Sequence, residues 1–332
     1  MPRGESSNGA IMKRVMTIAL LLVVPCAAMA ATARVPSQYA EIQAAIDASS
    51  SGDTILVGSG TYSIVGGYLV NKPLHIISEF GPDSTIIANS PPNCVGCPQT
   101  GSNGFMVSSL NGRFTIKGFT MMNHVEGMET VHSGGWGVYV FKASGTISNN
   151  VFRDNESAGV ELPLGSSVIV ENNLFTGNQV GISIWNGGSG DIRFNTIVGS
   201  TGYAQIHFGM AGTHATVNNN IIVNCSGGGI HSDGLGSYQI SCNDVWNNAG
   251  GNYNGTLPDQ TGINGNISLD PLFCGVAGSG NFHLQSGSPC APQNVPGACS
   301  GQGMGCYPAT CTIAVKQQSW GSIKSLFGNQ KK

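Results

Sequence analysis

Side chains suited to acid/base chemistry are sparse in this sequence, and several of them recur at a similar interval. Asp, Glu, Lys and Arg together make up 9% of the 332 residues. Carboxylates and imidazoles can exchange protons near neutral pH, and aromatic faces stack on sugar rings. The recurring residues of these types are Tyr139, Glu161, Trp185, His207, His231 and Asp233. If the fold brings these residues together, the Glu, His and Asp side chains would be able to transfer protons while the Tyr and Trp rings bind a carbohydrate.

The interval between them matches a repeat that runs through the middle of the chain. Its phrases read NNVFRDN at 149–155, NNLFTGN at 172–178, NTIVGS at 195–200, NNIIVN at 219–224 and NDVWNN at 243–248. Steps of 23, 22, 25 and 23 residues separate Asn150, Asn173, Asn195, Asn220 and Asn243. Two apolar columns keep this register, one of Ile147, Val170, Ile192, Val217 and Ile240 and one of Val138, Val160, Ile182, Ile206 and Ile230. A fixed period of this length predicts a solenoid.

The predicted solenoid is all-β, because each period holds short alternating runs such as 181–185 between Gly and Asn. We expect a parallel β-helix whose coils each make about three short strands and stack about 4.8 Å apart. At the observed period, residues 35–290 give room for roughly 11 coils. A β-propeller would need a period of about 40 residues or more.

The composition fits this architecture and excludes others. The 49 glycines suit tight corners, where Asn is also tolerated, and stacked like charges would repel one another. A hydrophobic fraction of 40% argues against disorder, and a net charge of −3 argues against a nucleic-acid partner.

Strand alternation gathers the candidate residues on one sheet face. If Val138 points inward, Tyr139 points outward. The equivalent outward positions on the following coils are Glu161, Ser183 with Trp185, His207, and His231 with Asp233. We predict a ligand groove here, with Glu161, His207, His231 and Asp233 as catalytic acid/base candidates and Tyr139 and Trp185 as substrate-binding platforms. Glu161 and His207 would lie two coils apart, about 10 Å. The alternative is an ordinary wet face with incidental polar side chains.

Two loops exceed the repeat rhythm, at residues 88–103 and 124–135. We expect both to leave the same edge of the rod on neighbouring coils, where insertions commonly carry function. The second loop holds metal-ligand types at His124, Glu126, Glu129 and His132. Their loose spacing favours a solvated loop, so no metal site is predicted. Calcium is left open as a cofactor, although no Asp cluster supports it.

The N-terminus predicts export. Lys13 and Arg14 precede the apolar run 15–24, and Ala28-Met29-Ala30 follows with small residues. These are the three parts of a secretory signal peptide, assigned to residues 1–30, and the run is too short for a membrane span of about 20 residues. The true start is Met1 or Met12. We expect a secreted protein, extracellular or at the cell surface, with the periplasm as the alternative.

Cysteine usage predicts disulfides, because export leads to an oxidising compartment. Of ten cysteines, Cys26 lies in the signal, so nine remain and one is left over. Sequence alone does not give their connectivity. Cys94-Val-Gly-Cys97 has zinc-like spacing without a second such pair, which favours a structural bridge over a metal or redox site.

The chain divides into a β-helix domain at 31–290 and a tail at 291–332. The tail contains Cys299, Cys306 and Cys311. Its apolar residues Trp320, Ile323, Leu326 and Phe327 recur at helical spacing and predict a short amphipathic helix. Two interpretations stay open: a hydrophobic cap over the last coil, or a surface-attachment or sorting segment.

Several stretches resemble a known family. VPSQYAEIQAAIDASSSGDTILVGSGTYS at 35–63 resembles the opening of pectin-lyase-like right-handed β-helix proteins, whose first coil is capped by a short helix. Ile42, Ala45 and Ile46 would form the capping face. SLDPLFCG at 268–275 and NFHLQSGSPC at 281–290 resemble the terminal coil of secreted bacterial members. The resemblance implies this fold, bacterial origin, and a polysaccharide lying in the sheet groove.

The catalytic motifs of the resembled enzymes are absent from the sequence. It has no calcium-binding Asp cluster of pectate lyases, no adjacent aspartates with Gly-His-Gly as in polygalacturonases, and no Tyr-Gly-x-Asp-Pro-His run of alginate epimerases. From the fold resemblance and the outward acid/base and aromatic residues, we still predict a secreted protein that binds or modifies extracellular polysaccharide, as a lyase, hydrolase or epimerase. The alternative is a non-catalytic, adhesin-like surface rod. The oligomeric state stays open.

Overall fold

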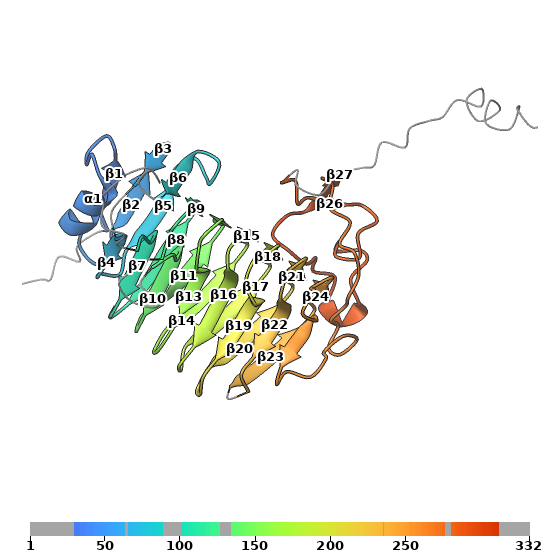
Figure 1. The fold of residues 1–332 in the computed structure, drawn as a ribbon. Helices are drawn as coiled ribbons and strands as arrows, with labels where there is room; N and C mark the ends of the chain where they lie inside the picture. Colours follow the sequence, from blue (N-terminus) through green and yellow to red (C-terminus); the bar gives the residue numbers. More distant parts are fainter. Residues whose placement is uncertain are drawn as a thin grey trace, which may run out of the picture.

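Three parallel sheets run along the molecule and together form a β-helix (Figure 1). The structure, a computed structural model, describes residues 30–63, 66–88, 101–126, 134–234, 236–275 and 280–311. Each full coil contributes one strand to each sheet, so strands three apart in sequence pair in parallel. The predicted all-β solenoid of about 11 coils is confirmed.

The sheets have nine, eight and eight strands. The first sheet contains β1 (Thr32–Val35), β2 (Thr54–Val57), β5 (His75–Ser78), β8 (Arg113–Lys117), β11 (Ser144–Ser148), β14 (Ser167–Glu171), β17 (Ser189–Arg193), β20 (His214–Asn218) and β23 (Ser237–Ser241). The second sheet contains β3 (Gly60–Tyr62), β6 (Thr85–Ala88), β9 (Thr120–Met122), β12 (Val151–Arg153), β15 (Leu174–Thr176), β18 (Thr196–Val198), β21 (Ile221–Val223) and β24 (Asp244–Trp246). The third sheet contains β4 (Tyr68–Val70), β7 (Phe105–Ser108), β10 (Val138–Phe141), β13 (Ala158–Leu162), β16 (Val180–Trp185), β19 (Ala204–Gly209), β22 (Gly228–Ser232) and β25 (Tyr253–Gly255).

Both apolar columns of the repeat form ladders in the core. The column that begins at Ile147 pairs residue by residue across the first sheet, and the column that begins at Val138 does so across the third. These side chains are buried in one continuous hydrophobic cluster. The 23-residue register therefore fixes which side of each strand faces outward.

An asparagine ladder holds the corner between the first and second sheets. The Asn150 amide donates to Asn173 Oδ1 at 3.1 Å, and the same bond repeats down the stack through Asn195, Asn220, Asn243 and Asn266 at 2.9–3.0 Å. The left-handed backbone angle falls on the preceding residue of each corner, for example Asn149 and Phe194. The left-handed backbone angle and the amide ladder therefore fall on neighbouring residues of each corner.

The expected N-terminal helix is present as α1 (Ile42–Ala48). It buries Ile42, Ala45 and Ile46 in the same cluster as the first coils, as predicted for a capping face. At the other end, β26 (Leu284–Gln285) pairs with β27 (Ala309–Cys311), and a turn of 3-10 helix, η1, covers Gly297–Cys299.

Two disulfides tie the C-terminal region together, Cys242–Cys299 and Cys274–Cys311. Leu284, Cys290 and Met304 share a second apolar cluster with Ile221 of β21, so residues on both sides of position 290 pack on the coils. Among the described cysteines, Cys225, Cys290 and Cys306 are thiols. Three predicted features lie outside the described residues: the pair Cys94 and Cys97, residues 1–29 of the expected signal peptide, and the expected helix at 320–327. No helix in the described part of the chain is long and apolar enough to span a membrane.

Candidate functional site

The outer face of the third sheet carries a continuous row of polar and aromatic residues. Tyr139 of β10 pairs with Glu161 of β13, and the row continues through Ser183, His207, His231 and Asn254 on the next four strands. Val138 and Val140 are buried beneath this row, as predicted. Strand alternation therefore places the predicted residues on one face.

A cavity of about 270 Å³ opens on this face. Four of the six predicted site residues line it: Glu161, Trp185, His207 and Asp233. Trp136 and Tyr203 complete its aromatic walls. Of the other two predicted residues, Tyr139 packs against Trp136 with ring centroids 4.7 Å apart, and His231 contacts Asp233. The structure thus brings all six predicted residues to one place.

Glu161 is buried rather than lying on an open sheet face, with 7% of its surface exposed. The expectation of an exposed position was wrong because aromatic side chains wall the cavity. Burial raises the pKa of Glu161 to about 8, and the Ser183 hydroxyl and the Trp185 indole N–H partly offset this. Ser183 Oγ donates to Glu161 Oε1 at 3.2 Å, whereas the indole nitrogen lies outside full hydrogen-bond geometry. At neutral pH Glu161 is mostly a neutral carboxylic acid.

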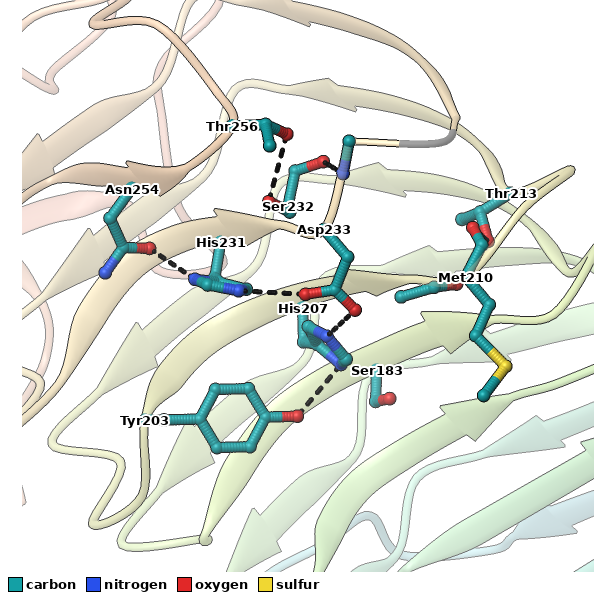
Figure 2. Close-up of polar contacts among 12 residues, drawn as sticks. Ser183, Tyr203, His207, Met210, Thr213, His231, Ser232, Asp233, Asn254 and Thr256 are labelled. Atoms are coloured by element: carbon teal, nitrogen blue, oxygen red, sulfur yellow. Dashed lines mark hydrogen bonds and ion pairs between the residues drawn. The ribbon is translucent and has the colours of Figure 1, made fainter.

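His207, His231 and Asp233 form a compact cluster, drawn in Figure 2. His207 comes from β19 and His231 from β22, and Asp233 follows β22 directly. The Asp233 carboxylate lies between the two imidazoles, with Oδ2 at 3.4 Å from His207 Nε2 and Oδ1 at 3.1 Å from His231 Nε2. Each ring also has an outer partner, Tyr203 OH at 2.9 Å from His207 Nδ1 and Asn254 Oδ1 at 2.9 Å from His231 Nδ1.

Burial and neighbouring charges shift the pKa values of His207 and Asp233. Burial lowers the pKa of His207, and this outweighs the opposing attraction of Asp233. Burial would raise the pKa of Asp233, but hydrogen bonds and charge from His231 and His207 hold it below its usual value. Asp233 is therefore ionised at neutral pH, while Glu161 in the same cavity is mostly protonated.

Sequence reasoning missed Trp136, Tyr203 and Asn254. The first two lie in turns before β10 and β19, outside the strand columns that the repeat defines. Burial raises the pKa of Tyr203 to about 12, so its hydroxyl stays protonated. Asn254 stands one coil after His231 in the same column and was open to prediction by extending that column.

Among the loop candidates, the described His124 does not line the cavity. His124 is 1% exposed, and burial lowers its pKa to about 4, so it does not belong to a solvated loop as expected. Its ring nitrogens have no hydrogen-bond partner among the described residues. Glu129 and His132, like most of the loop 88–103, lie outside the described residues. Gly104 and Gly137 directly precede β7 and β10, which are paired neighbours in the third sheet, so the two loop regions lead into neighbouring strands as expected.

Comparison with known proteins shows which folds this chain is similar to. The family model described as "Right handed beta helix region" matches residues 103–267. The crystal structure of pectate lyase Pel9A superposes with a TM-score of 0.54 at 15% identity, covering 81% of this chain and 91% of that one. The A-module of Azotobacter vinelandii mannuronan C-5 epimerase AlgE6 gives a TM-score of 0.45 at 18% identity, covering 63% and 72%. No curated protein matches by sequence. The chain therefore contains a right-handed β-helix region, and its fold is similar to that of the right-handed parallel β-helix of a pectate lyase.

Proposed function

We propose that this chain is a secreted enzyme that acts on an extracellular polysaccharide by acid/base chemistry in the cavity over β13, β16 and β19. The observation that carries the proposal is the pairing in one cavity of a protonated Glu161 with the ionised Asp233 and its two histidines. Carboxyl groups whose pKa values are pushed apart mark the acid and the base of a site.

Glu161 is the general acid. It keeps its proton at neutral pH because it is buried, and it lines the cavity where a substrate oxygen can approach. Proton donation by Glu161 to the glycosidic oxygen of the leaving group would lower the barrier to breaking the glycosidic bond.

The cluster of His207, His231 and Asp233 acts at the opposite end. His207 pairs in register with Ser183, which pairs with Glu161, so the backbones of Glu161 and His207 are about 10 Å apart at two strand spacings. The cluster would take a proton from the ring or from an attacking water, and these two outcomes separate a lyase or epimerase from a hydrolase.

The aromatic walls supply the sugar contacts. Trp136, Trp185 and Tyr203 line the cavity, and Tyr139 extends the aromatic surface beside Trp136. Aromatic rings bind the apolar faces of sugars while leaving hydroxyl groups to polar neighbours. The likeness of fold to a pectate lyase supports a polysaccharide as the substrate class.

The test is incubation of the purified protein with a panel of neutral and uronic-acid polysaccharides, measuring reducing ends, unsaturated products and epimerised residues. We expect one of these products on at least one substrate, and its loss in Glu161→Gln. Glu79→Gln, which alters an exposed ion pair with Arg34, is the matched control and keeps activity. Binding without any product would favour the non-catalytic rod instead.

A further inference from the structure

We propose that His207, His231 and Asp233 form a binding site for a divalent transition-metal cation of the zinc class. The inference goes beyond the proposed function, because it is measured without any sugar and stands or fails independently of turnover. It departs from the sequence analysis, which predicted no metal site and left only calcium open.

The positions of the three ligand atoms carry the inference. One ligand atom from each of His207, His231 and Asp233 lies within 4.8 Å of the ligand atoms of the other two. The two nitrogen-to-oxygen distances are 3.4 and 3.1 Å. Zinc bonds to nitrogen and oxygen are about 2.0–2.2 Å long, so two ligands on one tetrahedral ion stand about 3.4 Å apart. One cation can therefore contact all three atoms with small side-chain adjustments.

The proton on His231 is placed by its outer partner. Asn254 Nδ2 donates to Gly250 O at 3.2 Å, which leaves Asn254 Oδ1 to accept from His231 Nδ1. With Nδ1 as the donor to Asn254, Nε2 is the ring nitrogen that can bind a metal, and it lies 3.1 Å from Asp233 Oδ1.

His207 has the same arrangement. Its Nδ1 lies 2.9 Å from the Tyr203 hydroxyl, which can accept the Nδ1 proton and leave Nε2 free for a metal. Metal-binding histidines generally donate their second ring N–H to a neighbouring oxygen, which fixes the ring and its tautomer. Both rings of this cluster have such an oxygen, from Tyr203 and from Asn254.

Gly209 keeps the space between two of the ligands open. A Cβ atom built on Gly209 would lie 3.1 Å from His207 Nε2 and 3.2 Å from Asp233 Oδ2. The backbone of Gly209 does not have the positive φ that would itself favour glycine. The absence of a side chain at this position therefore preserves the room that a bound ion would occupy.

The donor set selects the kind of metal. Two imidazole nitrogens and one carboxylate suit Zn²⁺, Co²⁺ or Ni²⁺, whereas Ca²⁺ takes six to eight oxygen ligands. Because His207 and Asp233 line the cavity, the remaining coordination positions would face it. A catalytic zinc site has this form, with three protein ligands and an open position for water or substrate.

The experiment is titration of the chelator-treated, full-length chain with Zn²⁺ by calorimetry, and with Co²⁺ by visible absorption. We expect one ion per chain and a cobalt spectrum of nitrogen and oxygen ligands, without the charge-transfer band of a thiolate. His207→Ala, His231→Ala and Asp233→Asn should each weaken binding at least about 100-fold, and Tyr203→Phe about 10-fold. His214→Ala, an exposed histidine of β20, is the matched control and should change nothing.

Two further variants guard against misfolding and against confusion with turnover. Gly209→Ala keeps every ligand but fills the space, so it should weaken Zn²⁺ binding while circular dichroism stays unchanged. Glu161→Gln should lose activity yet bind Zn²⁺ as the parent does. The proposal is overturned if the parent chain binds no metal, if binding survives His207→Ala with His231→Ala, or if the spectrum shows sulfur ligands.

Discussion

Glu161 and His207 line one cavity from strands β13 and β19, which are separated only by β16. The repeat places them in the same outward column, and burial gives Glu161 a pKa of about 8. This relationship joins the architecture to the proposed chemistry, because the coil spacing sets the interval between acid and cluster.

Glu161 makes the fold less stable as the pH rises. Its pKa is raised from 4.5 to about 8, so between these values the unfolded chain releases a proton that the folded chain keeps. The free energy of unfolding therefore falls from about pH 4.5 to about pH 8. Glu161→Gln removes this contribution, and its Tm relative to the parent should rise between about pH 4.5 and pH 8 and then level off.

Asp244, whose pKa is raised to about 7, titrates in both proteins and cancels in that difference. Tyr139 and Tyr203, the titratable groups that interact with Glu161, stay neutral over this range because their pKa values are raised. A Tm difference that does not change with pH would show that Glu161 is not protonated in the folded protein.

The asparagine ladder should be strongly stabilising at its centre. The Asn195 side chain accepts from Asn173 and donates to Asn220, and it is fully buried. Asn195→Ala leaves buried groups without partners, at about 1–3 kcal/mol each, so we expect a loss of about 2–4 kcal/mol in urea unfolding. Asn218→Ala, at a half-buried position on β20, should cost less than about 1 kcal/mol. Equal losses would argue against the ladder as a source of stability.

Trp185 should contribute to carbohydrate binding. It is half-buried at the cavity wall, where an indole face can stack on a sugar. Trp185→Ala should weaken binding to the responsive polysaccharide about tenfold in affinity electrophoresis, with the circular dichroism spectrum unchanged. Phe80→Ala, an exposed aromatic residue outside the third sheet, is the control. Unaltered binding by the Trp185 variant would show that the polysaccharide binds outside this cavity.

The disulfide Cys242–Cys299 should hold the C-terminal region on the last coils. It spans 57 residues and lies in the apolar cluster that contains Met304. Replacing both cysteines with serine should lower the free energy of unfolding by about 2–4 kcal/mol. Limited proteolysis should then cut first between 280 and 311. Resistance equal to that of the parent would show that packing alone holds this region.

The sequence was sufficient for the fold and for the column of outward strand residues in the candidate site, because both follow from one register. The Val138 and Ile147 columns and the ladder from Asn150 repeat at a fixed interval, so pairing and facing direction could be derived from them. The outward strand positions then predicted Glu161, His207 and His231 from the sequence alone.

The environment of those residues could not be derived in the same way. Glu161 is buried in a cavity that Trp136 and Tyr203 also line, and these two residues lie in connections that the repeat does not describe. The side chains of His207, His231 and Asp233 meet because of their rotamers. Asp233, which follows β22, contacts both His231 of that strand and His207 of the neighbouring strand β19. Neither feature has a signature in residue spacing.

The central claim is tested most directly by the pH dependence of polysaccharide turnover in the parent chain and in Glu161→Gln. The account predicts measurable turnover that falls above about pH 8, as Glu161 loses its proton, and a variant that folds yet shows almost no turnover. Turnover by Glu161→Gln equal to that of the parent, with the same decline at high pH, would contradict it.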